Sequence, residues 1–180
     1  MKTVSLKKKT RIHPSSIVSP EAMIGDGVEI GPFCVVGPQV RIGRESRLFS
    51  HIHIDGNVEI GERCLIYPGV VLGMPAQARG LDRAARTRII IGNDNVLREY
   101  VTVHTGLKDG SKTLMGDRNI LMAYVHVAHD CVLGNDITIA NSVALAGHVE
   151  VADRAVIGGL VGVHQFVRIG TLSIVGALSK

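Results

Sequence analysis

Four of the eight histidines lie close together in the second half of the chain, and imidazole is the side chain best suited to proton transfer near neutral pH. These four are His126, His129, His148 and His164. One of them precedes a carboxylate directly, in the segment His126-Val127-Ala128-His129-Asp130-Cys131. Such a cluster is suited to two chemistries, proton transfer by a general base and metal binding.

The pair His129 and Asp130 favours a general base. A carboxylate bonded to one ring nitrogen fixes the tautomer of an imidazole, and it stabilises the imidazolium that forms when the other nitrogen takes a proton. The pair would activate a hydroxyl for attack on a thioester. The N–H of Gly147 would hold the resulting oxyanion, because a glycine lets a substrate approach closely.

The metal chemistry has weaker support. The closest pair, His126 and His129, is three residues apart, and no cysteine or acidic residue joins it at metal-ligand spacing. We therefore expect neither a metal nor another cofactor. A metal-dependent hydratase of the carbonic anhydrase type stays an alternative, because carbonic anhydrases with hexapeptide repeats bind zinc through three histidines.

A repeat of six residues indicates the scaffold that carries the histidines. An aliphatic residue recurs at every sixth position from Ile12 to Leu72, from Ile91 to Val103 and from Met115 to Val175, which makes 25 positions without a polar exception. A period of six matches no helix but suits one short strand and one corner. Three such strands close a triangular coil of 18 residues. We predict an all-β protein, a parallel β-helix over residues 12–180.

Two other residue types follow the repeat. Glycine often comes directly after the aliphatic residue, as at Gly31 and Gly61, and we expect it at corners because it tolerates the backbone angles needed there. Cys34, Cys64 and Cys131 all fall at the fifth position of their hexads, which points inward. We therefore expect buried thiols rather than nucleophiles or disulfides.

An 18-residue coil brings the histidines onto one patch. It places His129 above Gly147 and Gln165, on successive coils about 4.8 Å apart. His148 adjoins Gly147, and His164 adjoins Gln165. None of these residues occupies an aliphatic position, so their side chains point outward or lie at corners.

The repeat is interrupted at residues 74–90 and 106–114, and a regular coil needs no insertions. Two loops are therefore expected to leave the prism. The first carries four arginines, Arg79, Arg83, Arg86 and Arg88. Loops that project from a rigid scaffold are common binding elements, so these two are candidates for substrate contacts.

Charge and composition exclude several classes of function. There are 20 Lys and Arg against 16 Asp and Glu, a net charge of +4, which suits an acidic partner or a phosphorylated substrate. Only six aromatic residues occur, too few and too scattered for a nucleic-acid platform. No apolar run is long enough for a membrane span. Residues 1–11 form a basic arm that does not read as a secretory signal, so a cytoplasmic location is expected.

Six segments resemble the acyl-[acyl-carrier-protein]–UDP-N-acetylglucosamine O-acyltransferases, hexapeptide-repeat enzymes that begin lipid A biosynthesis. The resemblance follows family order over nearly the whole chain and rests on His13-Pro14, Ile30-Gly31-Pro32-Phe33-Cys34, Arg98-Glu99-Tyr100-Val101-Thr102-Val103-His104, His126-Val127-Ala128-His129-Asp130-Cys131, Leu145-Ala146-Gly147-His148-Val149 and His164-Gln165-Phe166. Parallel crossovers are normally right-handed, so the left-handed helix that we expect is implied by the resemblance alone.

The resemblance implies transfer of a 3-hydroxyacyl chain from acyl carrier protein to the 3-hydroxyl of UDP-N-acetylglucosamine, at sites between the subunits of a homotrimer. It makes His129 the general base, Asp130 its orienting group and the Gly147 amide the oxyanion donor. It assigns substrate contacts to four further residues, His126, His148, His164 and Gln165. An acidic carrier protein suits a basic surface.

The chain departs from the family in its first loop and at its end. The loop reads Ala76-Gln77-Ala78-Arg79-Gly80-Leu81 where the family has Pro-Gln-Asp-Leu-Lys-Tyr, so Gln77 is kept and Arg79 is a candidate for the lost cation. An acyltransferase for a different nucleotide sugar, forming an ester or an amide, is therefore an alternative, as is a non-catalytic scaffold. The family's C-terminal helical region is absent. Ala177 falls where the family measures acyl length, and it suggests a shorter chain than glycine would admit.

Overall fold

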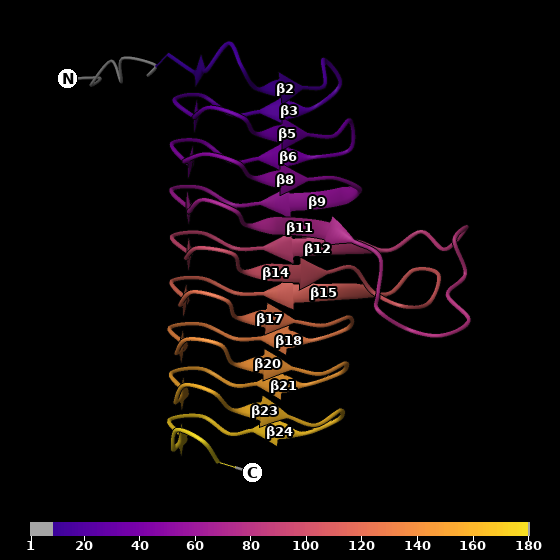
Figure 1. The fold of residues 1–180 in the computed structure, drawn as a ribbon, viewed down its shortest axis with the longest axis vertical. Coiled ribbons are helices and arrows are strands. Elements are labelled where there is room, and N and C mark those ends of the chain that lie inside the picture. Colours follow the sequence, from indigo (N-terminus) through magenta and orange to yellow (C-terminus); the bar gives the residue numbers. More distant parts are fainter. Residues whose placement is uncertain (1–8, 180) are drawn as a thin grey trace, which may run out of the picture.

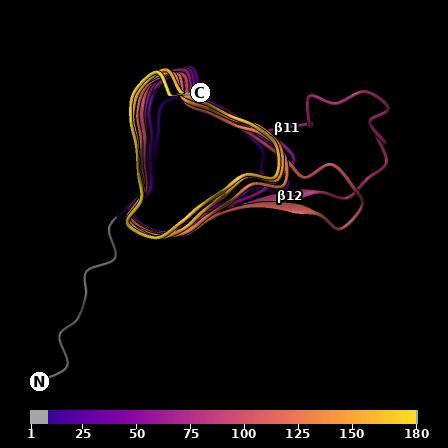
Figure 2. The same ribbon diagram turned by 90° about the horizontal axis from the view of Figure 1, so that it is seen from below.

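The computed structural model describes residues 9–179, which wind into a three-sided prism (Figures 1 and 2). Its 25 strands form three parallel sheets, because each coil adds one short strand to each side. The first sheet contains β1 (Arg11–Ile12), β4 (Glu29–Ile30), β7 (Arg47–Leu48), β10 (Leu65–Ile66), β13 (Val96–Leu97), β16 (Ile120–Leu121), β19 (Thr138–Ile139), β22 (Val156–Ile157) and β25 (Ile174–Val175). The second contains β2 (Ile17–Val18), β5 (Val35–Val36), β8 (His53–Ile54), β11 (Val71–Met74), β14 (Thr102–His104), β17 (His126–Val127), β20 (Ala144–Leu145) and β23 (Gly162–Val163). The third contains β3 (Met23–Ile24), β6 (Arg41–Ile42), β9 (Asn57–Ile60), β12 (Arg88–Ile91), β15 (Lys112–Met115), β18 (Val132–Leu133), β21 (Glu150–Val151) and β24 (Arg168–Ile169).

The β-helix is left-handed, as expected from the resemblance. Seen from its C-terminal end, the chain runs clockwise from β11 to β12 while it advances toward the viewer (Figure 2). Neighbouring coils pair in a constant register: Arg11 pairs with Glu29, and Glu29 pairs with Arg47. This 18-residue step matches the coil length that the hexads predict.

The interior of the prism is aliphatic, as the repeat predicts. Side chains such as Leu48, Ile66 and Leu97 stack in neighbouring coils and are 0–1 % exposed. Burial of these apolar surfaces is the main favourable contribution to the fold. In the first described coil, Ile12 remains 45 % exposed.

At most second positions of the hexads, glycine recurs for a different reason from the one we expected; Gly73 (φ 94°) is an exception. The left-handed backbone conformation falls on the fourth position, where side chains such as Phe33 (φ 60°) and Arg63 (φ 54°) adopt it. Gly43, at the second position, does not adopt it. A Cβ on Gly43 would lie 2.5 Å from the Gly61 carbonyl carbon on the next coil. Close approach of the coils, rather than unusual backbone angles, therefore requires glycine there.

The three cysteines are buried and unpaired, which confirms the sequence prediction. Burial is the main cause that raises the pKa of the Cys131 thiol to about 11, and burial raises the pKa of Cys34 and Cys64 as well. Thiols in this state are poor nucleophiles near neutral pH.

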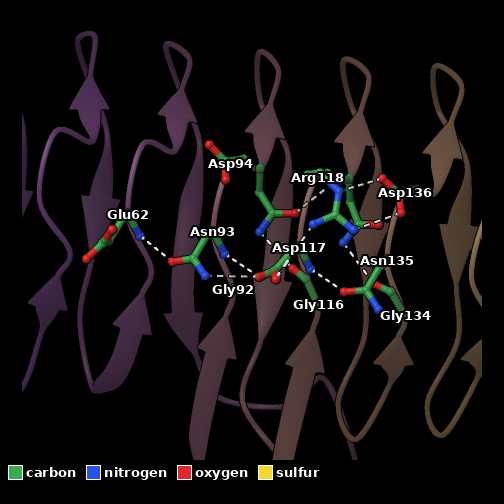
Figure 3. Close-up of polar contacts among 12 residues, drawn as sticks. Glu62, Gly92, Asn93, Asp94, Gly116, Asp117, Arg118, Gly134, Asn135 and Asp136 are labelled. Carbon is green, nitrogen blue, oxygen red and sulfur yellow. Dashed lines mark hydrogen bonds and ion pairs between the residues drawn. The ribbon is translucent and has the colours of Figure 1, made fainter.

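The turns that join the third sheet to the first form a corner held by side-chain amides and carboxylates (Figure 3). The N–H of Asn93 donates to Asp117 Oδ1 (2.6 Å), and the N–H of Asp117 donates to Asn135 Oδ1 (2.8 Å). Arg118 and Asp136 pair alongside (2.7 Å). We call this corner the ladder corner. It shows how a regular coil satisfies the amides at the third position of its hexads.

Both interruptions of the repeat form loops that project from a different corner of the prism, the one between the second and third sheets. We call it the loop corner (Figure 2). The loops span residues 75–87 and 105–111, less than the sequence indicates. The difference arises because β12 and β15 extend outward and pair with each other from Arg88 with Lys112 to Ile91 with Met115.

The sequence predicts a basic N-terminal arm and no membrane span. Residues 1–8 of the expected basic arm lie outside the described residues, and β1 begins at Arg11. The described residues contain no helix long and apolar enough to cross a membrane.

Candidate active site

The candidate site lies at the loop corner, where three successive coils leave β17, β20 and β23. His126 pairs with Ala144, and Ala144 pairs with Gly162. The two small residues hollow the surface beside His126. The resulting cleft of about 470 Å³ gathers six residues expected from the sequence, namely Gln77, His126, His129, Gly147, His164 and Gln165.

His129 and Asp130 form the hydrogen-bonded pair that the sequence predicts. His129 Nδ1 lies 2.9 Å from Asp130 Oδ2, and each side chain is only 11 % exposed. An ionised carboxylate only accepts hydrogen bonds, so this contact assigns the proton of a neutral His129 to Nδ1. Nε2 is then the basic atom, and no hydrogen bond joins it to another residue between 9 and 179.

Gly147 lies directly beneath that basic nitrogen. A Cβ on Gly147 would come within 2.5 Å of His129 Nε2, so only glycine leaves room for the ring. The Gly147 N–H has no hydrogen-bond acceptor in the part of the chain that the structure describes. The equivalent amide of Asp117 at the ladder corner does have one. A proton acceptor and an available amide donor therefore adjoin each other in the cleft.

His148 lies on the other side of Asp130. Its ring contacts His129 edge to face (centroids 5.1 Å apart) and stacks on Phe166 (4.7 Å). His148 Nε2 is 3.8 Å from Asp130 Oδ2. Ligand atoms of His129, Asp130 and His148 all lie within 4.8 Å of one another, a donor set that could hold a metal ion. Within this set, His129 Nδ1 and Asp130 Oδ2 lie at hydrogen-bond distance (2.9 Å).

His126 is fixed from the preceding coil. Thr102 Oγ1 lies 2.8 Å from His126 Nδ1, and the buried ring of His104 contacts His126 edge to face (5.0 Å). Burial lowers the pKa of both histidines, and the neighbouring His126 lowers that of His104 further. Both rings are therefore neutral near pH 7. His104 Nδ1 is buried and has no hydrogen-bond partner within residues 9–179.

Sequence reasoning did not identify Thr102 or His104 as parts of the site. Thr102 pairs with His126 across a step of 24 residues, because the second loop adds residues to the coil. Subtracting the six residues by which this step exceeds the regular 18 places Thr102 beside His126.

Two residues assigned from the resemblance lie away from this cleft. Arg79 is exposed in the first loop. Arg83 and Arg86 line a separate cleft of about 700 Å³ beneath the loops, where Arg86 also pairs with Asp109 (3.1 Å). Ala177 lies next to Gly158, at the corner between the first and second sheets. The larger cleft lacks the histidines, so we assign the chemistry to the smaller one.

No family model matches the chain. Two curated relatives carry the name acyl-[acyl-carrier-protein]–UDP-N-acetylglucosamine O-acyltransferase. The protein from Thermodesulfovibrio yellowstonii is 48 % identical over 125 residues, covering 69 % of this chain and 48 % of the relative. That from Rhizobium johnstonii is 42 % identical over 176 residues, covering 97 % and 64 %. The crystal structure of the Francisella novicida UDP-N-acetylglucosamine acyltransferase superposes with a TM-score of 0.86 and 35 % identity, covering 93 % of this chain and 67 % of that one. The chain belongs to the UDP-N-acetylglucosamine O-acyltransferase family.

The match to the O-acyltransferase family concerns the β-helix. The chain spans about half to two thirds of the length of these curated relatives, 48 % and 64 %. Within that part, the chain has the prism and the cleft that contains His129.

Proposed function

We propose that this protein transfers a 3-hydroxyacyl chain from acyl carrier protein to the 3-hydroxyl of UDP-N-acetylglucosamine, the first step of lipid A biosynthesis. Family membership supports the reaction class and both substrates. The observation that carries the proposal is the position of His129 Nε2, unbonded and next to the Gly147 amide in a cleft.

In the proposed mechanism, His129 Nε2 takes the proton of the sugar 3-hydroxyl while that oxygen attacks the thioester carbonyl. Asp130 holds Nδ1–H and stabilises the imidazolium. The Gly147 N–H donates to the oxyanion of the tetrahedral intermediate. When the intermediate collapses, the carbon–sulfur bond breaks, and the carrier thiolate takes the proton from His129. The products are the ester and the free thiol, so no cofactor is needed.

The remaining residues of the cleft would bind the substrates. Neutral His126 and the exposed His164 and Gln165 suit hydrogen bonds to a sugar or a diphosphate, and Gln77 enters from the first loop. Arg79 would supply a cation. Because Ala78 and Gly80 replace the acid and lysine of the family loop, a different nucleotide sugar stays an alternative acceptor.

We propose a homotrimer as the active assembly. Both loops project beyond the prism from the corner that holds the cleft, so a neighbouring subunit placed there would cover it (Figure 2). The basic net charge of +4 favours association with an acidic carrier protein. Ala177 would limit the acyl chain across such an interface. A cytoplasmic location stays a prediction.

The decisive experiment is an acyl-transfer assay that pairs UDP-N-acetylglucosamine with 3-hydroxyacyl carrier proteins of several chain lengths. We expect an ester product, with a preference for one chain length. Transfer to a UDP-amino sugar in place of UDP-N-acetylglucosamine would change the acceptor but keep the mechanism. No transfer and no binding of either substrate would instead favour a non-catalytic scaffold.

A further inference from the structure

Asp130 adopts a strained backbone conformation, and the coil before it cannot support that conformation in the usual way. Its φ is 60°, in the left-handed region that is unfavourable for side chains other than glycine. On later coils the equivalent residues are held by the main chain. The N–H of His148 donates to the carbonyl of His129 (3.0 Å), and that of Phe166 donates to the carbonyl of Gly147 (3.3 Å).

In the coil that precedes Asp130, the chain does not form a regular corner but projects as the loop 105–111. The carbonyl that would accept from the Asp130 N–H is therefore missing. The N–H of Asp130 donates instead to the hydroxyl of Thr113 (3.0 Å). Thr113 is 1 % exposed, on β15, where the loop rejoins the prism. A side-chain hydroxyl thus replaces the main-chain acceptor that the loop removed.

The loop also reaches back to the carboxylate. The N–H of Leu107 donates to Asp130 Oδ2 (3.1 Å), the same oxygen that accepts from His129 Nδ1 (2.9 Å). The loop itself is tied down, because the N–H of Arg86 donates to Asp109 Oδ1 (2.7 Å) and the Arg86 side chain pairs with that carboxylate. Both ends of Asp130, its amide and its carboxylate, are therefore fixed by the second loop and its return strand.

We propose that Thr113, together with the Leu107 amide, positions Asp130 so that its carboxylate holds His129 in the Nδ1–H tautomer. Thr113 is not among the residues that line the cleft and makes no hydrogen bond to His129, so it acts through Asp130. This role explains the second loop. In place of one main-chain contact, the loop and its return strand supply two groups that hold one residue: the Thr113 hydroxyl holds the amide of Asp130, and the Leu107 N–H holds its carboxylate. The kinetic consequence of this role rests on the proposed acyl transfer, whereas its structural consequence does not.

The test compares Thr113→Val with Thr113→Ser in the full chain. Ser46→Ala is a matched control, because the buried Ser46 hydroxyl likewise accepts a backbone N–H, that of Cys64, at 3.0 Å, far from the cleft. We expect Thr113→Val to lower kcat about 10–100-fold with little change in KM, because small displacements of catalytic groups have effects of this size. We expect Thr113→Ser, which keeps the hydroxyl, to have a kcat close to that of the wild type, and Ser46→Ala to leave kcat unchanged.

A second measurement is independent of activity. The ¹⁵N shifts of the His129 ring report which nitrogen carries the proton, and we expect Thr113→Val to move that population toward Nε2–H while Ser46→Ala does not. Leu107→Pro, which deletes the amide donor from a surface loop, is expected to shift it the same way and replaces Thr113→Val if that variant does not fold. Wild-type kcat and an unchanged tautomer in the variant used would overturn the proposal. If the wild-type protein transfers no acyl chain, the proposed function fails, and the tautomer measurement still decides the role of Thr113.

Discussion

The ring of His129 lies over Gly147, close enough that a Cβ on Gly147 would come within 2.5 Å of Nε2. This relationship links the two proposed catalytic roles, because one residue is the proposed proton acceptor and the other supplies the adjacent amide. Any side chain at position 147 would displace the ring. A substitution at position 147 therefore perturbs the site locally, and its effect on activity can be compared with its effect on the stability of the β-helix.

Gly147→Ala is expected to lower kcat about 100-fold, because the methyl group pushes the imidazole away from the substrate hydroxyl. Gly170→Ala serves as the control, since its Cβ would meet only the Ser173 hydroxyl, at 3.4 Å. Steady-state kinetics of the two variants provide the measurement. Equal kcat values for both would contradict the placement of Gly147 in the site.

His129→Ala is expected to lower kcat by two to four orders of magnitude, the usual contribution of a general base, while leaving the fold intact. Asp130→Asn should also lower kcat, because an amide can stabilise the wrong tautomer and cannot stabilise imidazolium as a carboxylate does. Circular dichroism checks the fold of each variant. A folded His129→Ala protein with a near-normal rate would exclude His129 as the base.

Gln77→Ala is expected to raise KM for the nucleotide sugar with a smaller effect on kcat, because Gln77 lines the cleft but lies outside the proton-transfer pair. Arg79→Ala should have the same effect only if the exposed first loop contacts the nucleotide. Kinetics at saturating acyl carrier protein separate the two parameters. A change in kcat alone would argue against a binding role for Gln77.

The buried histidines predict how stability depends on pH. The folded state holds the pKa of His104 and His126 below the ordinary value of about 6.5, chiefly through burial. The unfolded chain therefore binds more protons than the fold as the pH falls through 6.5, and stability is lost in that range. The carboxylates Asp94 and Asp136, whose pKa is lowered by arginine partners, lose their contribution only at more acidic pH.

Melting temperatures between pH 8 and pH 5 measure this effect. The wild-type value should be constant above about pH 7 and should fall below about pH 6.5. A double variant, His104→Asn with His126→Asn, should show a flatter profile in the same window. An identical slope in both proteins would show that other groups dominate the linkage.

Chelation distinguishes the proposed base from a metal site at His129, Asp130 and His148. We expect acyl transfer to survive EDTA treatment and dialysis unchanged, because the proposed steps need only protein groups. Metal analysis of the purified protein is the companion measurement. Stoichiometric zinc that is lost together with activity would favour the metal-dependent hydratase.

The fold was largely predictable from the sequence because the same interaction repeats in every coil. An inward position such as Ile66 or Leu97 meets the same aliphatic neighbours above and below, so its residue type alone reveals its place. The prediction for the second-position glycines was wrong at Gly43 for a physical reason. Gly43 is dictated by its distance from the next coil, a tertiary contact that local conformational preference does not reveal.

The candidate site was predictable only where the coil is regular. His129, Gly147 and Gln165 follow the 18-residue step, and the structure brings them together. Thr113 and His104 lie next to the two loops, whose lengths break the count, so their neighbours could not be read from spacing. Backbone donors such as the Leu107 amide leave no trace in residue type at all.

The constant register of Arg11, Glu29 and Arg47 has a consequence for how such a protein can change in length. Coils interact only with their neighbours, so the chain is modular. Excising residues 24–41 would put Ile42 in the place of Ile24 and leave every distance around His129 unchanged. For the cleft that contains His129, the coils before residue 71 therefore act as a spacer, whose height can be adjusted by evolution or by design, one 18-residue unit at a time, without altering the lining of that cleft.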